Sequence, residues 1–451
     1  MNLAQTLSHY VHKFRFEALP SPVIHEAKRR VIDSLGCALA AFNTRPGRIT
    51  RKIAETGLGR ARVIGTRLKT TPSLATFANS SLIRYWDYND TYLSKEPAHP
   101  SDNLGALLAV VQSEHKTGKD FISALIIAYE IQCRLCDAAS LRTRGWDHVT
   151  YGAFSVALGV GKLMNMPVDQ LVHALGLSGV DSAALRQTRV GEISDWKASA
   201  FANTARNAVF ACELARMGMT GPSAIFEGEK GFHRLVSGPF KLAALGGGNL
   251  PFKILETYIK FYPVEYHAQA AVEAALRLVP RVMNFNRIEK IDVDTYDVAI
   301  EIIVRDPEKW NPKSRETADH SLPYVIARSL LDGQMTLRQF SEKKIRDSAV
   351  LQLMKKIHIR EDKKMSRAYP KTLPCRIRIQ EKGAELLEEL VEIPRGHYMN
   401  PMSDEEVEEK FIQLTAPFIS KSKQKQALEL VWNLERIRNW DQLMDTLVVE
   451  K

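Results

Sequence analysis

The spacing of apolar and polar positions changes partway along this chain. Over the first 270 residues, apolar side chains recur every three or four positions, which is the spacing of amphipathic helices joined by short turns. Ser21-Pro22 has the form of a helix start, with an N-cap residue before a proline in the first turn. Further helices are predicted over 119–139, 150–164, 168–177, 197–217 and 266–278. The stretch ASAFANTARNAVFACELA is rich in small residues, so its helix can approach its neighbours closely.

Strand periodicity enters after about residue 285. Apolar residues alternate with aspartates at 291–295, and with polar residues at 375–380 before a Lys382-Gly383 turn, which predicts a β-hairpin with a return strand near 390–393. Helical segments are expected at 324–331 and 341–357, and Ser403 has the form of an N-cap for a last helix. The predicted fold is mainly α with a smaller α+β part. Residues 1–270 and 405–451 are assigned to an all-helical domain, and residues 271–404 to an inserted α+β lid domain.

Composition narrows the classes of protein to which the chain can belong. Its 451 residues, 45% hydrophobic and 25% charged, are typical of a globular protein with two domains. The net charge of +10 is scattered over short clusters without a nucleic-acid-binding motif. No apolar run reaches the length of a membrane span, and the first residues lack the pattern of a signal peptide. We therefore expect a cytoplasmic protein with neither nucleic acid nor membrane as a partner.

The five cysteines raise the question of disulfides or an iron–sulfur cluster. An odd, sparse set in so long a chain argues against a disulfide framework and fits a reducing compartment. Cys133 and Cys136 have the Cys-x-x-Cys spacing of a cluster motif, but the run around them is helical and lacks the Gly or Pro of a cluster loop. Buried free thiols are the favoured interpretation. We expect neither a metal nor another cofactor.

Residues 87–103, DYNDTYLSKEPAHPSDN, concentrate polar chemistry around two prolines. The segment carries Asp87, Thr91 and His99, and its prolines restrict the backbone. Loops dense in acids and histidines commonly hold proton-transfer groups. A solvated surface loop of turn and capping residues is the alternative, and composition alone favours neither.

Four further segments carry ionisable residues beside predicted helices. Lys197 and Arg206 in DWKASAFANTARN are nine positions apart, which puts them on opposite faces of a straight helix. Arg206 lies among small apolar residues, so we expect an anionic partner for it, either a protein carboxylate or a substrate. The segments RGWDHVTYG, KFYPVEYHAQ and ETADHSLPY supply His148, Lys260, His267, His320 and Tyr324. Taken singly, a structural role explains each histidine at least as well as a catalytic one.

Together and in their order along the chain, the five segments resemble the MmgE/PrpD family, which includes 2-methylcitrate dehydratases, cis-aconitate decarboxylases and an iminodisuccinate epimerase. The resemblance covers essentially the whole chain, and DYNDTYL, HPSDNLGA, YPVEYHAQAAVEAA and ADHSLPYVIARSLLDG are similar to the dehydratase branch in particular. It implies a homodimer with an active site between a helical domain and an α+β lid. The family positions imply catalytic roles for Asp87, Thr91, His99, His148 and Tyr324. They imply substrate binding by Arg206, Lys260, His267 and His320.

The resemblance further implies dehydration of a small tricarboxylate, with 2-methylcitrate of propionate catabolism (the methylcitrate cycle) as the best candidate and citrate or cis-aconitate as others. Such a reaction removes a proton beside a carboxylate and expels a hydroxyl group. Without a metal, cationic side chains must stabilise the charge that develops, and a general acid must protonate the leaving group. We expect Asp87 and His99 to form the proton-transfer pair. Alternatives are decarboxylation or epimerisation of a small polycarboxylate, and a non-catalytic anion-binding protein.

Overall fold

The computed structural model describes residues 1–450, which fall into two compact units. The helical unit comprises residues 1–189, 195–257 and 403–450, and the α+β unit comprises residues 190–194 and 258–402. Sequence reasoning set the boundaries at 270 and 404. Residues 258–270 belong to the α+β unit because Tyr258 stacks on both Tyr266 and His397, with ring centroids 4.8 and 4.5 Å apart.

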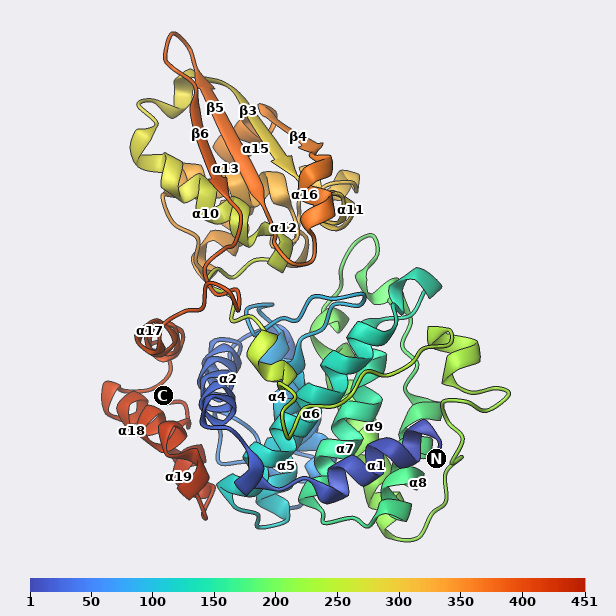
Figure 1. Ribbon diagram of the computed structural model, residues 1–451. Coiled ribbons are helices and arrows are strands. Elements are labelled where there is room, and N and C mark those ends of the chain that lie inside the picture. Colours follow the sequence, from blue (N-terminus) through green and yellow to red (C-terminus); the bar gives the residue numbers. More distant parts are fainter. Residues whose placement is uncertain (451) are drawn as a thin grey trace. The chain divides into compact units, whose positions relative to one another are not determined.

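The helical unit is built from two stretches of helices that are far apart in sequence (Figure 1). A two-stranded antiparallel ladder, β1 (Ala61–Arg62) with β2 (Lys69–Thr70), completes the unit. The predicted helices are present, with ends shifted by a few residues. Their bounds are α1 (Leu3–Lys13), α2 (Ser21–Ala40), α3 (Arg45–Ala54), α4 (Pro72–Arg84), α5 (Leu104–Ser113), α6 (Gly118–Ala138), α7 (Gly152–Leu163), α8 (Val168–Asp181), α9 (Trp196–Arg216), α17 (Asp404–Thr415), α18 (Lys421–Trp432) and α19 (Asp441–Thr446).

Close packing of α4 positions the polar loop that follows it. Helix α4 packs against α5 and α9, and α9 also packs against α7 and α8. A Cβ atom at Gly105 would lie 2.5 Å from the backbone nitrogen of Ser80, so glycine is required for the approach of α5 to α4. Because α4 ends at Arg84 and α5 begins at Leu104, this pair of helices fixes both ends of the loop between them.

The last helices of the chain belong to the helical unit. Helix α17 packs against α2. Its buried Lys410 lies with Nζ 2.6 Å from a carboxylate oxygen of Asp33 on α2 and donates a hydrogen bond of 2.8 Å to the carbonyl of Tyr88. The C-terminal segment therefore supports the loop after α4 directly.

The α+β unit contains a four-stranded sheet in the order β4-β3-β5-β6. Its strands are β3 (Ile288–Thr295), β4 (Ile357–Glu361), β5 (Cys375–Glu381) and β6 (Leu387–Val391). Strand β4 pairs parallel with β3, and the other pairs are antiparallel, including the predicted hairpin of β5 and β6. Alternate residues of β5 are buried, and α10 (Gln269–Leu278) packs against β5, β6 and α13 (Leu322–Asp332). Shorter helices complete the unit: α11 (Asp297–Ile303), α12 (Arg315–Ala318), α14 (Glu342–Ile345), α15 (Ser348–Met354) and α16 (Lys363–Ala368).

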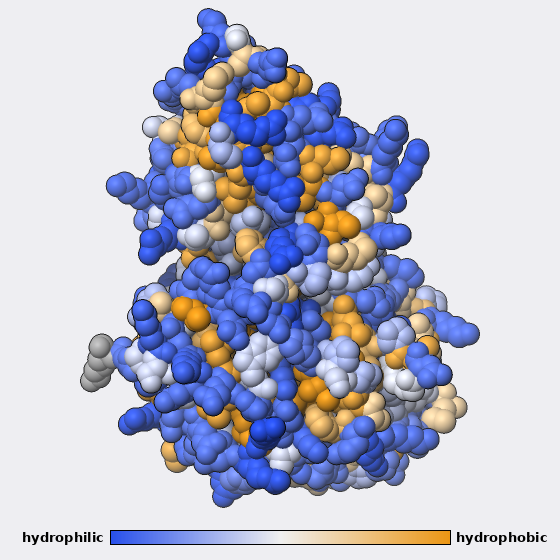
Figure 2. Space-filling view, turned by 60° about the vertical axis from the view of Figure 1, so that its left-hand side comes forward, coloured by the Kyte–Doolittle hydropathy of each residue, from blue (hydrophilic) through white to orange (hydrophobic). Residues whose placement is uncertain are grey.

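The hydrophilic character of the surface agrees with the charged fraction of the sequence. On the face drawn in Figure 2, hydrophilic side chains predominate and apolar patches are scattered between them. Among residues 1–450, no helix combines the length and the apolar character needed to cross a bilayer.

Candidate active site

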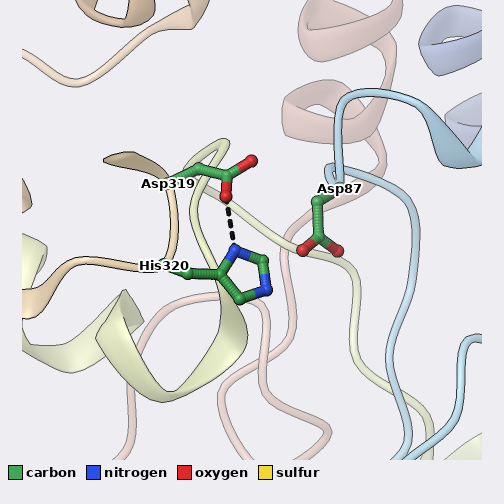
Figure 3. Close-up of side chains that lie close together, drawn as sticks. All are labelled: Asp87, Asp319 and His320. Atoms are coloured by element: carbon green, nitrogen blue, oxygen red, sulfur yellow. Dashed lines mark hydrogen bonds and ion pairs between the residues drawn. The ribbon is translucent and has the colours of Figure 1, made fainter. Parts of the chain in front are cut away.

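Asp87 lies at the centre of a buried ionic cluster in the helical unit. It follows α4 on the loop that the sequence singled out (Figure 3). Its backbone φ of +51° falls in the left-handed region, which Asp adopts more readily than most residues. Arg84 Nη1 donates to Oδ1 of its carboxylate at 2.5 Å, and Lys197 Nζ donates to Oδ2 at 3.0 Å. All three side chains are buried. A carboxylate between two cations is strongly held, since each charge compensates the burial of the other.

His99 joins the same cluster through Arg84. Arg84 Nη2 lies 2.9 Å from His99 Nε2, and the other ring nitrogen, Nδ1, lies 2.7 Å from the carbonyl oxygen of Asp90 and 3.3 Å from Thr91 Oγ1. An acceptor carbonyl requires the proton on Nδ1, and the guanidinium requires a lone pair on Nε2, so these contacts favour one neutral tautomer. His99 Nε2 is 3.8 Å from Asp87 Oδ1. Arg84, which sequence reasoning left out, therefore connects the two residues expected to form a pair.

Asp102 extends the cluster behind Arg84. Its side chain accepts a hydrogen bond of 2.9 Å from Asn89 Nδ2, and its other oxygen lies 3.7 Å from Arg84 Nε. Burial raises the pKa of Asp102 to about 7, although the charge of Arg84 opposes that shift. Asp102 thus changes protonation state near neutral pH.

His148 lies beside His99, with ring centroids 5.7 Å apart. Its Nδ1 is 3.1 Å from Oδ1 of Asp147, whose other oxygen is 2.9 Å from Arg189 Nε. Burial lowers the pKa of His148 well below its ordinary value, and Arg189 adds to that effect. His148 is therefore neutral at physiological pH.

Helix α9 brings Lys197 to the cluster and leaves Arg206 outside it. The two residues lie on opposite faces of the helix, as their spacing predicted: Lys197 is buried and Arg206 is exposed. Arg206 Nη2 donates to the side-chain oxygen of Asn207 at 3.0 Å. The expectation that apolar residues enclose Arg206 is wrong, because its side chain is exposed. Since Arg206 lies on the face of α9 opposite the cluster, we leave it out of the proposed substrate-binding groups.

The polar residues of the α+β unit form two hydrogen-bonded pairs, His267 with Tyr296 and His320 with Asp319. His267 Nδ1 lies 2.6 Å from the hydroxyl of Tyr296, and the backbone N–H of His267 donates to Glu265 Oε2 at 2.7 Å. His320 Nδ1 is hydrogen-bonded to the carboxylate of Asp319, whose second oxygen is 2.9 Å from Arg315 Nη1 (Figure 3). A backbone hydrogen bond of 2.9 Å from Glu265 N–H to the Asp319 carbonyl joins the two pairs.

Lys260 and Tyr324, the remaining predicted site residues, are both buried in the α+β unit. The Tyr324 hydroxyl donates to the carbonyl of Gln339 at 2.5 Å, and its ring packs near Phe340. Burial raises the pKa of this hydroxyl. These contacts anchor α13 to the segment that follows it, and we leave Tyr324 out of the proposed catalytic groups.

The thiols weighed as cluster ligands lie inside a helix. Cys133 and Cys136 are both in α6 and fully buried. Burial raises the pKa of each thiol well above its ordinary value. Among the described residues, no group of side chains placed to hold a metal ion includes either thiol.

Comparison with known proteins identifies the family. The family model of the MmgE/PrpD N-terminal domain matches residues 5–244, and the family model of the MmgE/PrpD C-terminal domain matches residues 262–436. A probable 2-methylcitrate dehydratase of Saccharomyces cerevisiae is 30% identical over 87% of this chain and 81% of its own length. A 2-methylcitrate dehydratase of Cupriavidus necator is 30% identical over 85% of this chain and 84% of its own length. A fungal alkylcitrate dehydratase is 28% identical over 90% of this chain and 86% of its own length. The chain belongs to the MmgE/PrpD family.

Proposed function

We propose that this chain is a hydro-lyase that removes water from a small branched tricarboxylate, with 2-methylcitrate as the best candidate substrate. The observation that supports the proposal most strongly is the buried cluster of Arg84, Asp87, His99 and Lys197, together with His148 beside it. The relatives are dehydratases of citrate derivatives, and the chain spans most of their length. An enzyme of the carbon–oxygen lyase class accounts for both.

The chemistry of the cluster suits this elimination. Loss of a proton beside a carboxylate places extra negative charge on that carboxylate, and buried cations stabilise such charge more strongly than exposed ones. Arg84 and Lys197 provide two fixed positive charges, and Asp87 holds both in place before the substrate binds. We propose Asp87 and His99 as the pair that protonates the leaving hydroxyl group: when substrate draws Arg84 away from His99 Nε2, the ring takes up a proton there, and Asp87, 3.8 Å away, stabilises the imidazolium.

Three parts of the proposal rest on family membership alone. We propose that Lys260, His267 and His320 bind substrate carboxylates, that the enzyme functions as a homodimer, and that it serves propionate catabolism. Light scattering coupled to size-exclusion chromatography tests the second part, and a mass of twice 50.8 kDa is expected.

A substrate panel tests the function. The purified protein is incubated with 2-methylcitrate, a longer alkylcitrate, citrate and cis-aconitate, with and without a chelator, while alkene absorbance and carbon dioxide are followed. We expect alkene from 2-methylcitrate at the highest kcat/KM, at a rate that the chelator leaves unchanged. Carbon dioxide from cis-aconitate without dehydration would assign a decarboxylase instead, and no turnover on any member would favour the alternative of a non-catalytic anion-binding protein.

His99→Asn provides the first variant. A positioned acid–base group contributes about 10²- to 10⁴-fold to the rate, so we expect a loss in that range with 2-methylcitrate. Turnover within about tenfold of the parent would remove His99 from the proposed pair. His173→Asn, which changes a partly buried histidine on α8 outside the cluster, is the matched control.

A further inference from the structure

The two histidines of the buried cluster, His99 and His148, differ in the partners of their ring nitrogens. Both ring nitrogens of His99 have polar partners, Arg84 on Nε2 and the Asp90 carbonyl on Nδ1. In the part of the chain that the structure describes, His148 Nε2 is buried and has no hydrogen-bond partner. A buried nitrogen without a hydrogen-bond partner calls for an explanation, and a catalytic role is one such explanation.

Asp147 determines which ring nitrogen of His148 carries the proton and which carries the lone pair. It is fully buried, and its backbone N–H donates to the carbonyl of Ala184 at 2.8 Å. Its carboxylate accepts from the backbone N–H of Val149 at 3.2 Å and is 2.9 Å from Arg189 Nε, so its position is fixed from several directions. The carboxylate faces Nδ1 of His148 at 3.1 Å, which favours the proton on Nδ1 and the lone pair on Nε2.

We propose that His148 Nε2 is the general base that removes the carbon-bound proton, and that Asp147 is the positioning residue that sets its tautomer. This inference rests on the proposed function. Nε2 takes the proton, the electron pair of the C–H bond forms the new C=C bond, and the C–O bond breaks. The hydroxyl group leaves as water with the Nε2 proton of His99, which that ring took up on substrate binding, and proton exchange with solvent then resets both histidines.

The charges around His148 determine how its base strength responds to substitution. Asp147 favours the protonated ring, whereas Arg189, Arg84 and Arg186 disfavour it, and His99 faces it from the loop before α5. Removing the carboxylate must therefore lower the pKa of His148, and removing the Arg189 guanidinium must raise it. Opposite shifts from two residues in contact with each other are a signature that loss of packing alone does not produce.

The experiment combines two variants with the parent enzyme. The acidic limb of the pH profile of kcat/KM reports the base in the free enzyme. We expect Asp147→Asn to move this limb to lower pH and Arg189→Gln to move it to higher pH, each by about one unit. His148→Gln is expected to lose about 10²- to 10⁴-fold in kcat/KM. Asp169→Asn, an exposed change on α8, should leave the profile unmoved.

A second measurement does not require turnover. Among the 12 histidines, the ¹⁵N signals of His148 are identified by their absence in His148→Gln. We expect an Nδ1–H tautomer that remains neutral below the usual pKa of histidine. If the parent enzyme dehydrates none of the panel, the proposed function fails while the ring signals still test the tautomer. An Nε2–H tautomer, or unmoved limbs in both variants of an active enzyme, would overturn the assignment of the base.

Discussion

The polar clusters of the two units are assembled in different ways. In the helical unit, the carboxylate of Asp87 is held by Lys197, 110 positions away in sequence, and by Arg84 at the end of α4. In the α+β unit, His320 pairs with its neighbour Asp319. The first cluster depends on the packing of α4 against α9, and the second depends mainly on the local chain. Substitutions in the first should therefore disturb several groups at once, and those in the second only one.

Lys197→Met should have the largest effect of this kind. The change removes a buried cation and keeps a similar apolar stem, so kcat/KM with 2-methylcitrate is expected to fall about 10²- to 10³-fold. Initial rates of alkene formation measure the loss. Arg206→Met, on the opposite and exposed face of the same helix, should stay within about twofold of the parent. Equal losses in the two variants would contradict the distinction that the structure makes between these cations.

Asp102→Asn tests the electrostatics of the first cluster through stability. The folded-state pKa of about 7 lies above the ordinary value of 3.8, so the folded state holds this proton more tightly than the unfolded chain. The stabilisation from this group is present at low pH and is lost as pH rises from about 4 to about 7. Between about pH 5 and about pH 8, the variant should gain about 2 kcal/mol in unfolding free energy relative to the parent. Urea unfolding at both pH values measures the difference in unfolding free energy between the variant and the parent. A difference that does not change with pH would show that Asp102 titrates normally.

His320→Asn tests the locally built cluster. Because a substrate-binding group acts on the ground state as well as the transition state, we expect KM to rise about tenfold with a smaller change in kcat. Asp319→Asn should also raise KM, by a smaller factor, because Asp319 acts through the orientation of the His320 ring. A fall in kcat as large as that of Lys197→Met would show that the second cluster takes part in bond breaking.

Tyr324→Phe should have the smallest effect. It removes one hydrogen bond, to the Gln339 carbonyl, and is expected to lower the unfolding free energy by about 1 kcal/mol. The rate with 2-methylcitrate should be unchanged, because we assign this hydroxyl to the anchoring of α13. Loss of activity with full stability would return Tyr324 to the catalytic groups that the family resemblance implied.

Helix positions and the candidate loop were predictable because their signals are local. Ser403 as an N-cap, the hairpin turn at Lys382-Gly383 and the dense polar loop from Asp87 to His99 are all read within a few residues. Strand β4 was missed because it directly follows helix α15 in a run that has helical spacing.

The two cations of the cluster, Lys197 and Arg84, were not predictable from spacing alone. Helical periodicity separates Lys197 from Arg206, but it does not say which face of α9 meets the loop after α4. Arg84 carries no signal beyond its position just before that loop. Its contacts with both Asp87 and His99 depend on the tertiary position of the loop, which the sequence does not encode within any short window.

The contact of Lys410 with the Tyr88 carbonyl has a consequence for biosynthesis. As the chain leaves the ribosome, the α+β unit emerges complete before α17 exists, while the backbone beside Asp87 still lacks its C-terminal support. A polypeptide terminated after residue 402 would contain every proposed proton-carrying side chain and would still leave Asp33 without the lysine beside it. The support that Lys410 gives to the candidate loop therefore forms only after α17 has been synthesised.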